Sequence, residues 1–263
     1  MAAGEVLRGP AAGGFTVTVS GDNLGTTSSG DTSGGVCVVL TAPTATAPTT
    51  APDGTHSGPA SCNDARAAAA ASAAVTVVPP DAHGHNEVSF TMPAGLGTRI
   101  VSVLAWGQAG AKGARFAYSD PVVEAVTPFH GPTNGGTEVV VNGTNYGVPG
   151  YAPLQSVQVT FGTLVCSKAR SDACVADGRT CPCDVLKHDN GKITFTTPGG
   201  IGRDVPVTVQ VVEDGTVVAQ SVPMSFHYDP PLPVYALPYM ADAQGTRIAI
   251  PGINFGNVAD MPR

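Results

Sequence analysis

One pattern, written three times, constrains this chain more than any other feature of its sequence. Two turn residues precede a short run of alternating apolar residues, and Gly-x-Asn, one apolar residue and Gly follow. The copies span residues 13–25, 135–147 and 244–256, and in each the asparagine lies nine positions after the second turn residue. An internal repeat indicates several similar structural units that stack or pair to bury their apolar faces.

Each copy has the pattern of a β-strand between two turns. Apolar residues at every second position place one face of a strand on a core. In the turn that follows, asparagine and glycine tolerate left-handed backbone conformations, and the apolar residue between them can return to the core. The strand residues are Val17 and Val19, Val139 and Val141, and Ile248 and Ile250; the apolar turn residues are Leu24, Tyr146 and Phe255.

Two further landmarks extend the first two copies into long repeats. Residues 88–97 and 193–202 share Phe-Thr-x-Pro-x-Gly-x-Gly, and Phe-x-Tyr follows at 116–118 and 226–228. The same order of landmarks predicts two domains and the beginning of a third. We expect domain 1 at 1–120 with a low-complexity insertion at 41–74, domain 2 at 121–230, and an incomplete third repeat at 231–263, so that both ends are cut from a longer chain.

The second repeat carries the fullest set of landmarks. It has Gly131-Pro-Thr-Asn-Gly-Gly-Thr137, the Val-rich strand, Gly-x-Asn-Φ-Gly, Val159-Thr-Phe-Gly162, Phe-x-x-Pro and Phe-x-Tyr. These motifs resemble the immunoglobulin-like IPT/TIG domain, and the resemblance implies an all-β fold of tandem β-sandwiches. The first repeat departs from it at Phe15, which replaces a threonine, and at residues 36–40, which replace the Val-x-Phe-Gly strand.

The resemblance to this family does not identify a function. Similar domains occur in receptor ectodomains, bacterial surface proteins, carbohydrate-active enzymes and Rel-type transcription factors. The chain has a net charge of −7 and only 13 Lys and Arg, which argues against the clustered basic surface that a nucleic acid requires. The sequence contains neither a signal-peptide pattern nor an apolar run long enough to span a bilayer, so we expect no direct membrane insertion in this segment.

The insertion in the first repeat has a biased composition. Between the asparagine and the Phe-x-x-Pro landmark, the first repeat is 17 residues longer than the second, and its composition predicts little apolar burial. One interpretation of its Thr/Ala/Pro tract is a solvated polyproline-like loop. The other is a tract modified by O-linked sugar or hydroxyproline, with candidate sites Thr41, Pro43, Thr44, Thr46, Pro48, Thr49, Thr50 and Pro52.

An alanine-rich run ends the insertion and predicts a two-turn helix capped by Asn63 or Asp64. Beyond it, alternation predicts strands at 75–78, 87–91, 99–106 and 114–118. A Glu-Asp-Gly turn at 213–215 predicts a hairpin in the second repeat.

The cysteines divide evenly between the repeats. The first repeat contains Cys37 and Cys62, and the second contains Cys166, Cys174, Cys181 and Cys183. Even numbers favour disulfides within each domain, with Cys37 bonded to Cys62, and with Cys181 and Cys183 each bonded to Cys166 or Cys174. A zinc site is the alternative for the second set, although its spacing fits zinc knuckles poorly, and free thiols are the third.

Motifs for chemistry are otherwise scarce. Asn142-Gly-Thr is the chain's single N-glycosylation sequon, at the end of a predicted strand. No nucleophile elbow, zinc-protease motif or phosphate loop occurs. We therefore expect no enzymatic activity, no catalytic residue, no metal site and no cofactor.

The combined pattern predicts a structural or adhesive segment of a larger extracellular or cell-surface glycoprotein of the cell-wall, surface-filament or ciliary-appendage type, with the ciliary surface among its locations. Its expected partners are proteins, through self-association or contact with other surface proteins, together with covalent glycans, and not nucleic acids. The alternatives are a ligand-binding receptor ectodomain, which requires an apolar patch with aromatic anchors, and an intracellular dimerisation module, which requires free thiols.

Overall fold

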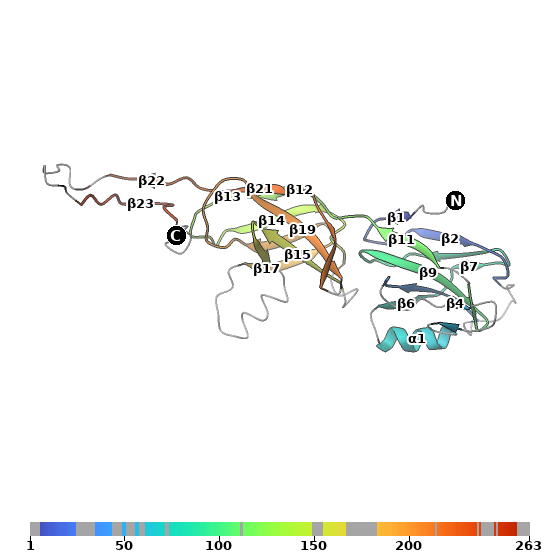
Figure 1. Cartoon of the computed structure of the whole chain (residues 1–263). Helices are drawn as coiled ribbons and strands as arrows, with labels where there is room; N and C mark the ends of the chain where they lie inside the picture. The colour runs from blue at the N-terminus through green and yellow to red at the C-terminus, as the bar shows by residue number, and fades with distance from the viewer. Residues whose placement is uncertain are drawn as a thin grey trace. The chain divides into compact units, whose positions relative to one another are not determined.

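The structure, a computed structural model, divides the chain into two compact units (Figure 1). Unit 1 comprises Met1–Asp120, Asn145–Ser156 and Val211–Ala219; unit 2 comprises Pro121–Thr144, Val157–Gln210 and Gln220–Arg263. The described residues are 6–24, 35–43, 49–50, 56–57, 61–71, 74–110, 113–148, 155–166, 183–213, 215–235, 237, 245 and 247–256.

Two sheets and one helix make up most of unit 1. The larger sheet has the order β1-β11-β9-β3-β6, with β10 paired to β9, and the smaller has the order β2-β8-β7. Only the pairing of β1 with β11 is parallel among the described pairs of these sheets. The bounds are β1 Leu7–Gly9, β2 Thr16–Ser20, β3 Val36–Thr41, β4 Thr49–Thr50, β5 His56–Ser57, α1 Cys62–Ala71, β6 Val75–Val78, β7 Ala82–His83, β8 Glu87–Thr91, β9 Thr98–Ala105, β10 Gln108–Ala109 and β11 Ala114–Tyr118.

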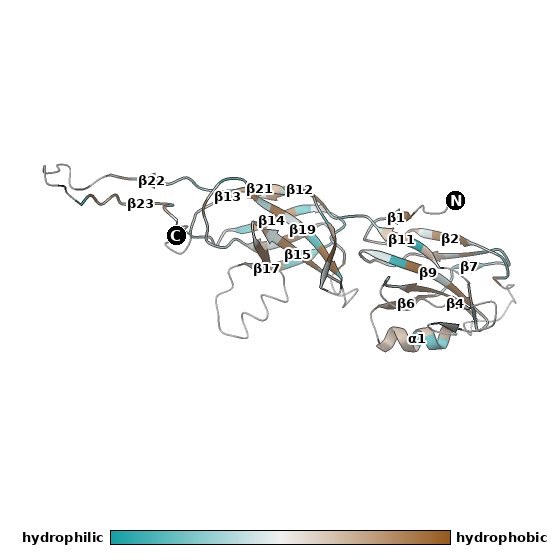
Figure 2. Cartoon of the chain, viewed as in Figure 1, coloured by the Kyte–Doolittle hydropathy of each residue, from teal (hydrophilic) through white to brown (hydrophobic). Residues whose placement is uncertain are grey.

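The core of unit 1 lies between these two sheets. Val38 and Leu40 of β3 pack in one cluster with Val88 and Phe90 of β8. Val17 and Val19 of β2 pack against the same cluster at partial burial, as the period-two pattern predicts. Hydrophobic and hydrophilic residues follow one another along the strands in Figure 2. The structure thus confirms the all-β sandwich expected from the sequence.

The insertion buries more than its composition predicts. Cys37 and Val39, on the other face of β3, pack with Leu104 of β9 and with Cys62 and Ala65 of α1. All six residues of β3 are therefore buried, because a sheet covers one face and the helix covers the other. The expectation of little apolar burial is wrong for this part of the insertion, since a helix rich in small residues lies close to a sheet.

The cap of α1 also differs from the prediction. The Ser61 side chain accepts a hydrogen bond from the Asp64 backbone N–H at 3.2 Å, and its hydroxyl donates to the Asp64 carboxylate at 2.8 Å. Ser61, and not Asn63 or Asp64, is therefore the N-cap. The sequence Ser-Cys-Asn-Asp contains this signal three residues apart.

A second pair of sheets follows β11. One has the order β12-β14-β18-β17, and the other has the order β13-β21-β19-β15-β16, with β20 paired to β19. The predicted hairpin at 213–215 joins β19 to β20. The bounds are β12 Val122–Thr127, β13 His130–Gly131, β14 Glu138–Thr144, β15 Gln155–Phe161, β16 Leu164–Cys166, β17 Asp184–Asp189, β18 Lys192–Thr196, β19 Val205–Glu213, β20 Thr216–Gln220, β21 Met224–Tyr228, β22 Leu232–Pro233 and β23 Gly252–Ile253.

The core of unit 2 is centred on aromatic rings from both sheets. Val139 and Val141 of β14 are fully buried, as is Phe195 of the neighbouring β18. Phe161 of the facing sheet makes edge contacts with Phe195 and Phe226, at centroid distances of 5.7 and 5.2 Å. Such edge contacts are favourable beyond the area that the rings bury.

The landmarks of the repeat meet in three dimensions, and they do so in both units. The Tyr118 hydroxyl donates to the Pro93 carbonyl at 2.8 Å, and the Tyr228 hydroxyl donates to the Pro198 carbonyl at 2.7 Å. The Phe-x-Tyr and Phe-x-x-Pro motifs are therefore two halves of one interaction, which explains why they recur together.

We expect Gly200→Ala to destabilise unit 2 more than Tyr228→Phe does. A Cβ on Gly200 would lie 2.7 Å from ring atoms of Tyr228, so the ring must move, at a cost of about 1–3 kcal/mol. Removing the hydroxyl alone loses one hydrogen bond, worth about 1 kcal/mol. Urea unfolding followed by circular dichroism checks the order of the two costs, and a larger cost for Tyr228→Phe would contradict this explanation.

The third copy of the pattern departs from its prediction. β22 and β23 form a two-stranded antiparallel sheet, and an isolated bridge joins Leu237 to Ala249. The side chains of Ile248 and Ile250, predicted to face a core, are 51% and 54% exposed. Among the described residues no second sheet covers them, and a sandwich core needs strands from both layers.

Candidate docking site

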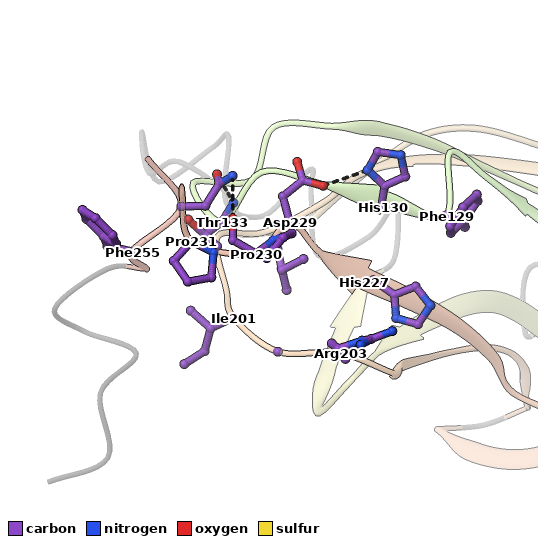
Figure 3. Close-up of a pocket in the computed structure, with 13 residues that line it drawn as sticks. Phe129, His130, Thr133, Ile201, Arg203, His227, Asp229, Pro230, Pro231 and Phe255 are labelled. Carbon is purple, nitrogen blue, oxygen red and sulfur yellow. Dashed lines mark hydrogen bonds and ion pairs between the residues drawn. The ribbon is translucent and has the colours of Figure 1, made fainter. Parts of the chain in front are cut away.

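A pocket of about 810 Å³ opens in unit 2 beside the asparagine turn of the third copy. Residues from four separate segments line it, including Phe129, Ile201, Arg203, His227 and Phe255 (Figure 3). Phe129 and Phe255 are 58% and 48% exposed, which is unusual for large aromatic side chains. The pocket is therefore an open hollow with apolar walls and not an enclosed cavity.

Two histidines are among the polar residues that line the pocket. His130 Nδ1 and Asp229 Oδ1 form a hydrogen bond at 2.8 Å, and the Asp204 backbone N–H donates to His227 Nδ1 at 3.0 Å. The Phe129 ring makes edge contacts with both imidazoles, at centroid distances of 5.2 and 6.2 Å. This arrangement can stack on an apolar or planar group and donate hydrogen bonds to it.

The asparagine turn of the third copy occupies one side of the pocket. Asn254 Oδ1 accepts a hydrogen bond from the Thr133 backbone N–H at 3.5 Å, and Asn254 Nδ2 donates to the Pro230 carbonyl at 3.4 Å. Gly256 approaches Ile201 so closely that a Cβ on it would lie 2.6 Å from Ile201 Cγ2. The turn thus docks through one side-chain amide and one bare glycine.

The turn of the second copy makes the same set of contacts within unit 1. Asn145 Oδ1 accepts a hydrogen bond from the Ala11 backbone N–H at 3.2 Å, and Asn145 Nδ2 donates to the Asp120 carbonyl at 3.3 Å. A Cβ on Gly147 would lie 2.7 Å from Leu96 Cδ1. We call the three groups that receive each turn, namely a backbone N–H, a backbone C=O and a branched aliphatic side chain, the turn socket.

The sequence predicts the backbone conformation of these turns but not their contacts. The predicted left-handed conformation is confirmed, since φ is 62° at Asn23, 62° at Asn145 and 59° at Asn254. The hydrogen bonds of the amide were not predicted. A signal was present, because glycine tolerates a positive φ at least as well, yet all three copies have asparagine.

The structure joins two cysteine pairs. Cys37 of β3 is bonded to Cys62 at the start of α1, with 5.9 Å between the Cα atoms. Cys166 at the end of β16 is bonded to Cys183, with 5.2 Å between the Cα atoms. Both pairings are among those expected, whereas Cys174 and Cys181 lie outside the described residues.

The candidate modification sites are distributed between accessible and inaccessible places. Asn142 is half-buried on β14, where Ala125 and Lys192 are its neighbours on the adjoining strands. The side chain of Thr41 is fully buried in β3, so its hydroxyl is not accessible to a sugar, whereas Pro43 is exposed. Thr49 and Thr50 form β4, and the other candidates lie outside the described residues: Thr44, Thr46, Pro48 and Pro52.

Two kinds of feature are missing from the described part of the chain. No group of three or more His, Cys, Asp or Glu side chains is arranged to hold a metal ion there. None of the helices described is both long and apolar enough to cross a bilayer.

Comparison with protein families gives one match. Residues 121–228 match the family model described as the IPT/TIG domain. No curated protein matches the sequence.

Several solved structures are similar to the chain at low identity. The extracellular region of plexin A4 is 20% identical, and the match covers 93% of this chain and 17% of plexin A4, with a TM-score of 0.32. SGBP-B of a xyloglucan utilization locus in Bacteroides uniformis is 18% identical over 90% of this chain and 55% of its own, with a TM-score of 0.29. The Yersinia pseudotuberculosis adhesin InvE is 14% identical over 87% of this chain and 57% of its own, with a TM-score of 0.31. This chain thus spans less than two thirds of the length of each of these proteins.

Proposed function

Residues 121–228 form an IPT/TIG domain, and on this basis we propose that the chain is a non-catalytic structural or adhesive segment of a larger extracellular or cell-surface glycoprotein. The observation that carries this proposal is the repeated docking of the asparagine turn, through Asn145 in unit 1 and Asn254 in unit 2. A contact that recurs with each repeat is a means of building a tandem array. In such an array the three domains are 1–120, 121–230 and a third that begins at 231.

The cysteines support a location outside the cell. Disulfides persist in oxidising compartments and are rare in the cytosol, where thiols are kept reduced. Cys37 bonded to Cys62 and Cys166 bonded to Cys183 fit the first environment, whereas an intracellular dimerisation module requires free thiols. Covalent glycans at Asn142 and on the exposed part of the Thr/Ala/Pro tract belong to the same proposal. Cell walls, surface filaments and ciliary appendages are the surface structures that this composition fits.

The pocket beside the third copy favours a second candidate, a receptor ectodomain that binds a ligand. Exposed aromatic rings next to hydrogen-bonding side chains are typical of recognition sites, and Phe129, His130 and Phe255 provide both. A ligand bound there would contact unit 2 beside its turn socket. The structural proposal stands first because the turn contacts occur in two units, whereas the pocket is described in one.

Surface labelling of intact cells from the native source tests the location. Lys187 and Lys192 are exposed, so a membrane-impermeant amine-reactive biotin reagent will label a chain that faces the outside. The proposal predicts labelling before the cells are permeabilised. Labelling that requires permeabilisation, with a known surface protein labelled in the same cells as the control, would contradict it.

A further inference from the structure

We propose that the side-chain amide of the repeated asparagine is the group that docks each repeat onto the end of the preceding one. This inference rests on the proposed tandem function and names its contact at the level of atoms. Asn145 and Asn254 each bond one backbone N–H and one backbone C=O with the two ends of a single planar amide. The asparagine is thus a recognition residue as well as a turn residue.

The two sockets occupy equivalent places in the repeat. Ala11 and Thr133, which donate the N–H groups, each lie two residues before the Gly-Gly pair. Asp120 and Pro230, which supply the carbonyls, each lie two residues after the tyrosine of Phe-x-Tyr. Because these are backbone groups, the residue type in the socket can vary while its hydrogen-bonding pattern stays the same.

The chemistry of the turn explains why the residue is asparagine. The position has φ near 60°, which excludes most side chains but is tolerated by glycine, asparagine and aspartate. Docking needs an acceptor and a donor on one short side chain, and the carboxylate of aspartate accepts only. Glycine tolerates this φ but has no side chain to form the two hydrogen bonds, whereas asparagine tolerates the φ and can form both.

The first copy provides an internal control. Asn23 has the same φ, 62°, and the same Gly-x-Asn-Φ-Gly sequence, and its side chain is exposed. Within the described residues, Asn23 makes neither of the two socket hydrogen bonds. A substitution at Asn23 therefore reports the cost of changing the turn itself, apart from docking.

Asparagine-to-glycine variants of the full chain test the proposal, because glycine keeps the left-handed turn and removes only the amide. In Asn145→Gly we expect the Ala11 amide to exchange its hydrogen about tenfold faster, a factor that corresponds to about 1.4 kcal/mol of lost hydrogen bonding. Asn254→Gly should accelerate the hydrogen exchange of the Thr133 amide by a smaller factor, since the hydrogen bonds of Asn254 are longer than those of Asn145. The amides of β14 and β18 should not change in either variant.

Two results would overturn the proposal. One is an Ala11 amide that exchanges in Asn145→Gly at its original rate. The other is an Asn23→Gly variant in which the Ala11 or Thr133 amide exchanges its hydrogen as fast as in the Asn145→Gly or Asn254→Gly variant. This result would assign the effect to the turn and not to docking. A chain found only inside cells would remove the proposed function and leave this contact intact, so the two failures are distinguishable.

Discussion

Replacing Gly135 by alanine is expected to lower the free energy of unfolding of unit 2 by about 2–5 kcal/mol. Gly135 has φ of 73°, a conformation that costs an alanine about 1–2 kcal/mol. A Cβ at this position would also lie 2.5 Å from the Pro198 carbonyl carbon and the Gly199 nitrogen. Both atoms belong to the backbone, which cannot move aside as a flexible side chain can. Urea unfolding followed by circular dichroism measures the loss.

Gly136→Ala is the matched control for this substitution. Gly136 has φ of 81°, yet a Cβ added to it would have no heavy atom of the rest of the fold within 4 Å. It should therefore show only the conformational cost of about 1–2 kcal/mol. Equal losses for Gly135→Ala and Gly136→Ala would mean that the close approach to Pro198 contributes nothing. Gly13 and Gly14 repeat this contrast in unit 1, where the same order of effects is expected.

Removing the Cys37–Cys62 disulfide is expected to destabilise unit 1 by roughly 3 kcal/mol. The bond closes a loop with a sequence separation of 25, and opening it increases the conformational freedom of the unfolded chain. It also holds α1 against β3, where Cys37 and Val39 are fully buried. The double variant Cys37→Ala with Cys62→Ala is suitable, because a single substitution would leave a free thiol between α1 and β3, and serine would place a hydroxyl there.

The fluorescence of the single tryptophan, Trp106, provides a readout for unit 1, because its ring packs on Gly35. Reductant should lower the stability of the original chain in this assay and should leave the double variant unchanged. A double variant as stable as the original chain would show that the bond contributes little beyond the packing of α1. A variant that still responds to reductant would place the effect at the other cysteine pair.

The strand pattern could be predicted closely because it rests on local periodicity. Strands at 75–78, 87–91 and 114–118 have the predicted bounds, and all three turn asparagines have the predicted left-handed φ. Period-two burial and left-handed turns depend on neighbouring residues, so the sequence contains their signal. The same holds for the two repeats, whose motifs recur in one order.

Contacts between distant segments could not be predicted in the same way. The docking amide of Asn145 depends on Ala11, 134 residues away, and no local pattern connects these two positions. The burial of Cys37 and Val39 by α1 depends on where the insertion folds back. Ile248 and Ile250 show the converse, since their strand pattern is clear but no second sheet covers them among the described residues.

Non-reducing peptide mass spectrometry of the protein from its native source tests the central claim most directly. For an extracellular structural segment we predict peptides that join Cys37 to Cys62 and Cys166 to Cys183, together with sugar or hydroxyproline in the Thr/Ala/Pro tract or sugar on Asn142. Free thiols at all four of these cysteines, with an unmodified tract and a bare Asn142, would contradict the claim and favour an intracellular interaction module.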